Sequence, residues 1–135
     1  MLHPETQVIL PLLETPLEEL ILACVQQRLS EMPPIAWKQG ASATVVAASG
    51  GYPGAYEKGK VINGIDRCVE LGITVFHAGT QLSQEQLVTD GGRVLNVTAV
   101  GEDFDGALDK VYVGIQNIHF EGMYYRRDIG YRVRK

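Results

Sequence analysis

The 135-residue sequence has few cysteines and no long apolar run. Its two cysteines, Cys24 and Cys68, show no metal-ligand spacing, so the sequence indicates neither a disulfide framework nor a zinc site and is typical of a reducing cytoplasm. No apolar segment approaches the roughly 20 residues that a membrane-spanning helix needs, and the amino terminus lacks a signal-peptide layout. We therefore expect a cytoplasmic protein with no membrane partner.

A strong excess of charge of one sign is also missing. The formal net charge is −4, from 12 basic and 16 acidic residues, which gives no reason to expect a nucleic-acid partner. Apolar residues make up 45% and charged residues 21%, which is ordinary for a folded soluble domain and argues against disorder. The length is that of one domain, and the 15 glycines predict several tight turns.

The hydrophobic pattern predicts a first helix beginning near Thr15. Thr15 can cap this helix, Pro16 suits its first position, and Glu18 completes a capping box. Apolar residues then follow helical spacing until the prolines at 33–34 end the helix, after about four turns. One face of the helix should be buried in a core, with Cys24 on that face.

A second helix is predicted after Asp103, its expected cap, because Leu108, Val111, Tyr112 and Ile115 recur at helical spacing. Strands are predicted at residues 43–48, 73–76, 86–89 and 94–100. Residues 90–92, Asp-Gly-Gly, are a strong turn signal and predict a hairpin of the last two strands. The order of elements predicts an α+β fold with a largely antiparallel sheet and two main helices.

A glycine-rich loop follows the first predicted strand and is the first candidate site. Ser49, Gly50 and Gly51 open this loop, and Lys58 lies a few residues beyond it. Such a loop brings backbone N–H groups close to an anion, and a nearby lysine adds positive charge. The P-loop pattern is absent, and a glycine–proline loop of this kind is more often a simple turn.

Three further side chains are candidates for binding or catalysis. His77 ends a predicted strand, where it is either a general acid or base or a turn histidine that bonds local backbone groups. Arg93 follows a tight turn and suits two-pronged binding of a carboxylate or phosphate, or is a surface arginine on a hairpin. Arg126, close to Asp128, forms either an anion site or an ordinary ion pair.

Six segments in order make these weak signals specific. They are Pro-Glu-Thr-Gln (4–7), Ala-Ser-Gly-Gly-Tyr-Pro-Gly (48–54), Tyr-Glu-Lys-Gly (56–59), Phe-His-Ala-Gly-Thr (76–80), Gly-Gly-Arg-Val-Leu (91–95) and Arg-Arg-Asp-Ile-Gly-Tyr-Arg (126–132). The series resembles the carboxy-terminal region of the phosphoribosylamine–glycine ligases, which are ATP-grasp enzymes of purine synthesis. The resemblance covers nearly the whole chain.

The resemblance implies a reaction for the complete enzyme. ATP phosphorylates the carboxylate of glycine, and the amine of phosphoribosylamine then attacks the glycyl phosphate. The implied cofactors of the complete enzyme are ATP with Mg²⁺ or Mn²⁺, and the implied partners are glycine and phosphoribosylamine. Glu5 matches a family glutamate at the edge of the reaction centre. The implied substrate-binding positions, on a barrel-sandwich-like closing lobe, are Ser49, Gly50, Gly51, Lys58, His77, Arg93 and Arg126.

The sequence departs from the family before residue 4. There the family has Glu-x-Asn-x-Arg-x-Gly-Asp, with metal ligands, and this chain has only Met-Leu-His. We therefore expect residues 1–36 to be the end of an ATP-grasp domain with a connecting helix, residues 37–135 to be the closing lobe, and this chain to hold no cofactor. Three interpretations stay open: a ligase piece that is inactive alone, a free-standing binding or assembly module that forms homo-oligomers, and one half of a split ligase.

Overall fold

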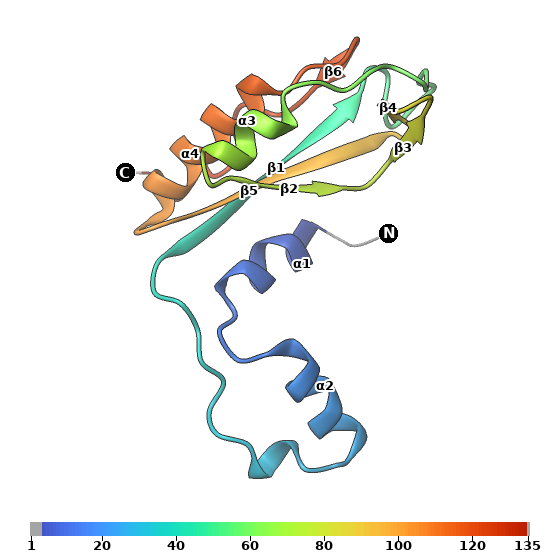
Figure 1. Ribbon diagram of the computed structural model, residues 1–135. Helices are drawn as coiled ribbons and strands as arrows, with labels where there is room; N and C mark the ends of the chain where they lie inside the picture. The colour runs from blue at the N-terminus through green and yellow to red at the C-terminus, as the bar shows by residue number, and fades with distance from the viewer. Residues whose placement is uncertain (1–3, 135) are drawn as a thin grey trace.

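The computed structural model describes residues 4–134. Figure 1 shows a body built on a twisted sheet, from which the segment after the first helix projects. The elements, in chain order, are α1 (Pro4–Ile9), the 3-10 turn η1 (Leu10–Leu12), α2 (Leu17–Val25), η2 (Leu29–Glu31), β1 (Ala41–Ser49), α3 (Ile65–Glu70), β2 (Thr74–His77), β3 (Thr80–Ser83), β4 (Gln86–Thr89), β5 (Arg93–Gly101), α4 (Phe104–Asn117) and β6 (Met123–Tyr124).

A four-stranded antiparallel sheet in the order β2-β5-β1-β6 forms the centre of the body. Its two long strands, β1 and β5, pair from Ala41 opposite Gly101 to Ala47 opposite Leu95, and the register shifts after Ala47. Both strands consist largely of small and β-branched residues, which suit a sheet covered on both faces. The predicted α+β class with a largely antiparallel sheet is confirmed.

The hydrophobic core lies between one face of this sheet and the helices α3 and α4. Alternate residues of β1 and β5 point into this core and meet the apolar face of α4, which includes Leu108, Val111 and Ile115. The predicted cap is confirmed, because Asp103 Oδ1 accepts a hydrogen bond of 2.8 Å from the amide of Gly106. The second helix therefore begins where the sequence placed it.

The other face of the sheet is covered by α1 and is more polar. Ser42, Asn96 and Thr98 are buried there, and the Thr98 and Thr44 hydroxyls lie 2.7 Å apart. Gln7 of α1 is also buried. The two faces of one sheet therefore differ, with an apolar core against α4 and a hydroxyl-rich surface towards α1.

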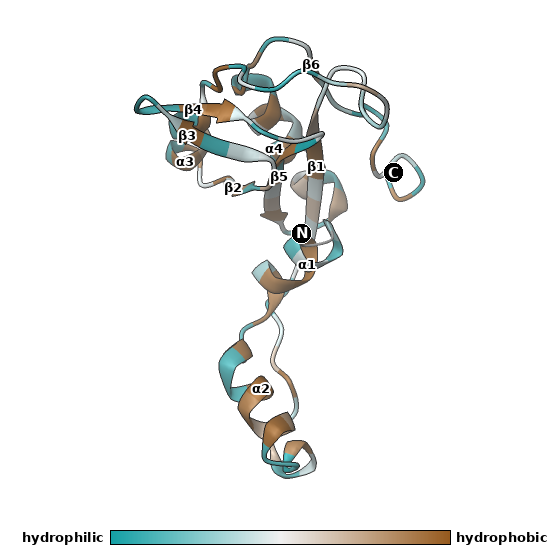
Figure 2. Cartoon of the chain, turned by 90° about the vertical axis from the view of Figure 1, so that its right-hand side faces the viewer, coloured by the Kyte–Doolittle hydropathy of each residue, from teal (hydrophilic) through white to brown (hydrophobic). Residues whose placement is uncertain are grey.

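Residues 10–40 form an extension that we call the arm. The arm leaves the body below α1 and carries α2 at its far end (Figures 1 and 2). Backbone hydrogen bonds hold the outgoing and returning segments of the arm together. They include the β-bridge between Leu13 and Trp37 and a 2.8 Å bond from Lys38 N to Leu12 O. The ribbon of α2 is largely hydrophobic (Figure 2), although this helix lies away from the core.

The structure of the arm differs from the prediction of a helix beginning near Thr15, which corresponds to α2. That helix has nine residues, about two and a half turns, and ends at Val25 instead of the prolines at 33–34. It ends early because Gln27 has a φ of 57°, which no helix can continue through. Thr15 does not cap it, since its hydroxyl accepts a hydrogen bond from the amide of Ala36 across the arm. The predicted burial of Cys24 is also wrong, since this thiol is exposed.

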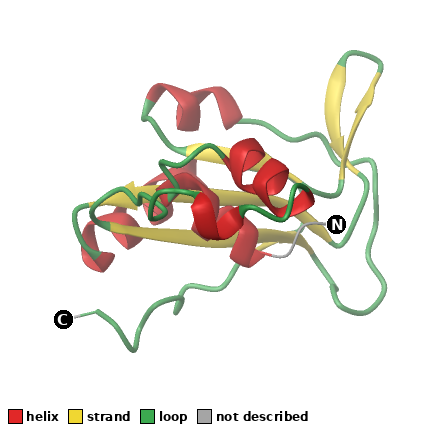
Figure 3. Ribbon diagram, turned by 90° about the horizontal axis from the view of Figure 1, so that it is seen from below, coloured by secondary structure: helices red, strands yellow, loops and turns green. Residues whose placement is uncertain are grey.

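The predicted hairpin of residues 86–89 and 94–100 is also wrong. β4 pairs with β3 in a separate two-stranded sheet, while β5 joins β1 and β2 in the central sheet. The turn of the real hairpin is made by Gln84 and Glu85, both with positive φ. Glycines tolerate such angles better than these residues, so the Gly91-Gly92 pair was the stronger turn signal. Figure 3 shows the β3–β4 hairpin standing apart from the central strands.

Within residues 4–134, no helix combines the length and the hydrophobicity needed to cross a membrane.

Candidate functional site

Three glycine-containing loops meet at the end of the sheet where β1 finishes and β5 begins. Ser49, the last residue of β1, donates from its hydroxyl to Gly91 O and from its amide to Gly92 O, both at 2.8 Å. Gly79 donates to Arg93 O at 2.8 Å, and a Cβ on Gly79 would lie only 2.6 Å from Gly91 Cα. The sequence segments 48–54, 76–80 and 91–95 therefore converge, and glycine is required where their backbones touch.

A cavity of about 350 Å³ lies next to these loops, on the α1 face of the sheet. β1 forms its floor, and the tail after β6 forms one wall. Two arginines line it, Arg93 and Arg126, which are 33 residues apart in sequence. The lining residues are Pro4, Thr44, Val46, Ala48, Tyr52, Arg93, Tyr124, Tyr125, Arg126 and Ile129. We call this cavity the two-arginine pocket.

Arg93 is placed in the pocket by the strand register and the loop before it. It is the first residue of β5 and pairs with Ala48, which lies on the pocket floor. The ring of Tyr52 packs against the loop, because a Cβ on Gly92 would lie 2.7 Å from Tyr52 Cε2. The missing side chain of Gly92 thus makes room for a tyrosine in the pocket wall.

Arg126 enters the pocket already paired with a carboxylate. Its Nε and Nη2 donate to the two oxygens of Asp128 at 2.9 and 2.7 Å. This two-pronged bond raises the pKa of Arg126 and lowers the pKa of Asp128. A guanidinium has five N–H donors, and the pair uses two, so three remain for a ligand. Both alternatives from the sequence, an ion pair and an anion site, are compatible with this geometry.

A lysine that the sequence interpretation did not single out lines a cavity with the glycine loop. A smaller cavity of about 130 Å³ is lined by Ser49, Gly50 and Lys60, together with Glu57, Glu121 and Gly122. Lys60 Nζ lies 2.7 Å from Glu57 and 3.0 Å from Glu121, contacts that raise the pKa of Lys60 and, through the first, lower the pKa of Glu57. The predicted Lys58 instead forms an exposed ion pair with Asp90 at 3.1 Å, outside the lining of both cavities.

The remaining predicted residues lie around the pocket or away from it. Glu5 is in the first turn of α1, next to the pocket residue Pro4. Gly51 has a φ of 92°, so it gives the loop its left-handed turn. His77 is exposed at the end of β2, and its Nδ1 lies 3.1 Å from the Thr80 hydroxyl, a local partner that is a side chain and not one of the expected backbone groups.

The sequence interpretation missed the aromatic part of the pocket. From the sequence, Tyr52 entered only as part of the segment 48–54, and Tyr124 and Tyr125 were not singled out. All three line the pocket with the two arginines. The available signal was the run Tyr-Tyr-Arg at 124–126, since two rings beside a cation are typical of ligand walls.

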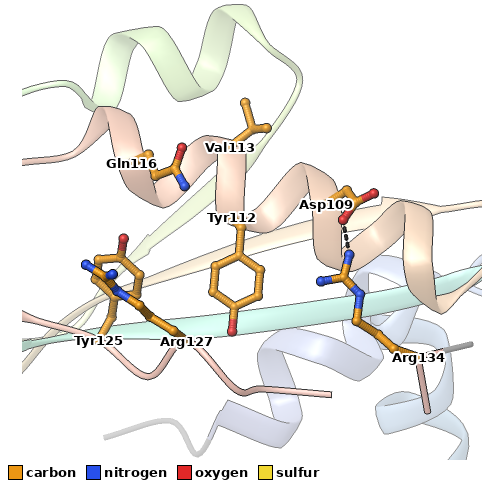
Figure 4. Close-up of a pocket in the computed structure, with 7 residues that line it drawn as sticks. All are labelled: Asp109, Tyr112, Val113, Gln116, Tyr125, Arg127 and Arg134. Atoms are coloured by element: carbon orange, nitrogen blue, oxygen red, sulfur yellow. Dashed lines mark hydrogen bonds and ion pairs between the residues drawn. The ribbon is translucent and has the colours of Figure 1, made fainter. Parts of the chain in front are cut away.

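A second cavity, of about 680 Å³, lies on the outer side of α4 (Figure 4). Tyr125 lines both cavities, and the guanidinium of Arg127 lies 5.8 Å from the centre of its ring. Arg134 is paired with Asp109 in this cavity and with Asp105 beside it. The tail thus separates the two cavities, with Arg126 on one side and Arg127 on the other.

Carboxylates, histidines and thiols do not gather into groups of three that suit a metal ion anywhere in residues 4–134. The candidate site of the described chain is therefore built from guanidinium groups, aromatic rings and glycine loops. Such a set is suited to an anion with an organic body, because guanidinium groups pair with negative charge and aromatic rings cover apolar parts of a ligand.

These features define an α+β lobe with the two-arginine pocket between its sheet and its carboxy-terminal tail. Residues 42–132 match the family model described as phosphoribosylglycinamide synthetase, C domain. The chain belongs to this family. The resemblance found in the six sequence segments is thereby confirmed.

Curated relatives extend the match beyond the family model. The chain is 74% identical over 131 residues to a phosphoribosylamine–glycine ligase of Nostoc sp., covering 96% of this chain and 31% of that protein. It is 51% identical over 129 residues to the trifunctional purine biosynthetic protein adenosine-3 of Gallus gallus, covering 96% of this chain and 13% of that protein. The chain thus spans less than a third of the length of these relatives.

A solved structure supports the same assignment. The crystal structure of a phosphoribosylamine–glycine ligase from Thermotoga maritima superposes with a TM-score of 0.73 at 38% sequence identity. The match covers 93% of this chain and 30% of that one. The α+β fold described above is therefore the fold of a lobe within a larger ligase.

Proposed function

We propose that this chain is the carboxy-terminal lobe of a phosphoribosylamine–glycine ligase and contributes contacts to an anionic substrate. The observation that supports this is the two-arginine pocket, in which Arg93 and Arg126 come together from two separate family segments. In the complete enzyme, glycine and phosphoribosylamine would be joined in the cytoplasm with hydrolysis of ATP. The chain alone would be inactive, with residues 1–36 belonging to the ATP-grasp domain and residues 37–135 forming the closing lobe.

The pocket chemistry fits the phosphate of a phosphorylated sugar amine. A phosphate carries up to two negative charges and accepts paired hydrogen bonds from guanidinium groups. Arg93 and the three remaining donors of Arg126 can supply these bonds, and the rings of Tyr52 and Tyr124 can cover the sugar. Holding the phosphate far from the reacting amine would orient the substrate, which is where such remote binding energy contributes to catalysis.

The other candidate residues are proposed to shape the closing lobe. Ser49, through its two bonds to the glycine pair at 91–92, holds the loop in which Gly50 and Gly51 lie. Lys58, His77 and Glu5 are proposed to face substrates only when the rest of the ligase is present. ATP and its Mg²⁺ or Mn²⁺ would be held by that larger part.

Binding by the chain alone tests the pocket directly. Ribose 5-phosphate, a stable analogue of phosphoribosylamine, would be titrated into the labelled chain and followed by amide NMR. We expect shifts at Gly92 and Arg93, and their loss in the variants Arg93→Met and Arg126→Met. Arg67→Met is the matched control, since Arg67 pairs with Glu70 at 2.7 Å on α3, outside the pocket lining. Equal binding by all four proteins would contradict the proposed pocket.

The ligase assignment needs a second experiment. ADP formation from ATP, glycine and phosphoribosylamine would be measured with this chain, and with a hybrid in which it replaces the matched part of the Nostoc ligase. The 74% identity makes such a hybrid practical. We expect turnover by the hybrid and none by the chain alone. Turnover by the chain alone, or a folded hybrid without turnover, would each contradict the proposal.

The arm favours a second function, assembly. It presents several half-exposed or exposed apolar side chains: Leu10, Leu17, Ile21, Leu22, Val25, Leu29, Ile35 and Trp37. A surface of this kind is typical of an interface with another chain or domain. We expect the chain to self-associate, or to bind the larger part of the ligase as one half of a split enzyme. Light scattering at high concentration tests this, and a strictly monomeric species would count against it. The variant Val25→Glu should reduce association without changing ribose 5-phosphate binding.

A further inference from the structure

We propose that Tyr112 is a positioning residue that holds Arg126 in place for anion binding. Tyr112 lies on α4 and lines the outer cavity, while Arg126 lines the two-arginine pocket. Tyr112 therefore acts on the pocket from the other side of the tail. The proposal rests on the proposed function, since it concerns how that pocket is kept ready to bind.

The phenol oxygen of Tyr112 makes two hydrogen bonds to the tail backbone. It donates to the carbonyl of Arg126 at 3.1 Å and accepts from the amide of Ile129 at 3.0 Å. One oxygen thus holds two backbone groups three residues apart. Figure 4 shows the ring reaching from α4 towards the tail, between Tyr125 with Arg127 on one side and Arg134 on the other.

The tail between β6 and residue 131 has few other attachments. Its short strand pairs with β1 only at Met123 and Tyr124. Ile129 packs against the core cluster, which fixes the far end of the segment. Between these two points, within the described part of the chain, the hydrogen bonds from the tail backbone to another element are those to Tyr112. Without them this segment would be held by apolar contacts alone.

The two hydrogen bonds of Tyr112 fix the position of the Arg126 side chain, which enters the pocket. A carbonyl held towards α4 sets the orientation of the Arg126 peptide, from which the side chain runs to the pocket. The hydrogen bond from the Ile129 amide to Tyr112 sets the turn that brings Asp128 alongside Arg126. The two-pronged ion pair can then form. A misplacement of about 1 Å can cost an enzyme about a hundredfold in rate, so we expect a displaced Arg126 to hold its ligand less well. Tyr112 itself is not expected to touch the ligand.

The variant Tyr112→Phe removes both hydrogen bonds and keeps the ring. We expect ribose 5-phosphate to bind about tenfold more weakly, a change equivalent to ~1.4 kcal/mol, with the fold retained by NMR. In the hybrid ligase, the KM for phosphoribosylamine should rise about as much while the KM for glycine stays unchanged. Thr15→Val is the matched control, because it removes a hydroxyl that accepts from a backbone amide, that of Ala36, in the arm and outside the pocket lining.

A double-mutant cycle separates positioning from general loosening. If Tyr112 acts through Arg126, then Tyr112→Phe should have little further effect on binding in an Arg126→Met background. An equal effect in both backgrounds would overturn the proposal, as would unchanged binding by Tyr112→Phe. Failure of the unsubstituted chain to bind ribose 5-phosphate would instead refute the proposed pocket. If Tyr112→Phe does not fold, hydrogen exchange of the Ile129 amide is measured in the unsubstituted chain. Ribose 5-phosphate should slow this exchange, and an unchanged rate would overturn the proposal.

Discussion

Replacement of Gly92 by alanine should damage the two-arginine pocket while leaving the fold in place. Gly92 lies in the loop that links the β3–β4 hairpin to β5, and the ring of Tyr52 covers it. The backbone angle does not forbid alanine, because Gly92 is not among the glycines with positive φ. The added methyl group would act only by meeting Tyr52, which makes the substitution a clean test of how the pocket wall is placed.

The size of the effect follows from the distances and from exposure. The new Cβ would overlap Tyr52 Cδ2 and lie 2.7 Å from Cε2, whereas ordinary carbon contacts are about 3.5 Å, so the ring must retreat by roughly 1 Å or more. Tyr52 is 42% exposed, so the ring can swing outward without compressing the core. The cost is then a strained side-chain rotamer, about 1 kcal/mol, at the low end of the 1–3 kcal/mol typical of overpacked cores. The loss of ribose 5-phosphate affinity should exceed this loss of stability, because the displaced ring leaves the pocket wall open.

Urea unfolding and ribose 5-phosphate titration together test this reasoning. Gly92→Ala should be compared with Tyr52→Ala and with the double variant, as a cycle. If the clash with Tyr52 is the whole cause, then Gly92→Ala should cost almost nothing in free energy of unfolding once Tyr52 is alanine. An equal cost in both backgrounds would refute the account. Unchanged ligand affinity in Gly92→Ala would refute the role of Tyr52 in the pocket wall.

Three further predictions follow from single contacts. Asp103→Ala removes the cap of α4 and should lower the free energy of unfolding by about 1 kcal/mol in urea; no change would show that the cap contributes nothing. Arg126→Met should raise the pKa of Asp128 back towards its ordinary value in a carbon-detected NMR titration. Because that pKa is lowered in the folded chain, the pair adds stability above the ordinary carboxyl range and loses it as pH falls through the folded value. Thiol reagents should modify Cys24 in the folded chain and reach Cys68 only after unfolding, since Cys68 is fully buried and burial raises its pKa; equal reaction rates would contradict this difference.

The sequence predicted most of the central sheet and α4, because their hydrophobic patterns match their burial. Residues 43–48 and 94–100 lie within β1 and β5, and Asp103 caps the helix that follows. The hairpin was misassigned because β3 has a polar, exposed pattern that gives no strand signal. The end of α2 was misplaced because Gln27 adopts a left-handed angle that a glutamine rarely takes, so no residue type marked it.

The sequence motifs of the candidate site could be predicted, but which of their residues lie together in one pocket could not. The segments at 48–54, 76–80 and 91–95 converge because their glycines allow backbone contact, and the sequence shows such glycines plainly. Which cations share a pocket depends on strand register and on the course of the tail. A shift of one residue in β5 would turn Arg93 to the opposite face of the sheet, and no local pattern brings Arg126 close to it.

The ion pair of Arg126 with Asp128 suggests how an occupied arginine can still serve a ligand. Both side chains are largely exposed, and exposed ion pairs contribute little stability. Sharing the guanidinium with a phosphate therefore costs little free energy. Asp128 uses the Nε edge of the group and leaves other donors available. In the absence of ligand, the carboxylate therefore keeps the long Arg126 side chain in one rotamer, which reduces the entropy lost on binding. Tyr112 holds the backbone and Asp128 holds the side chain, so the direction of Arg126 is set before any anion arrives.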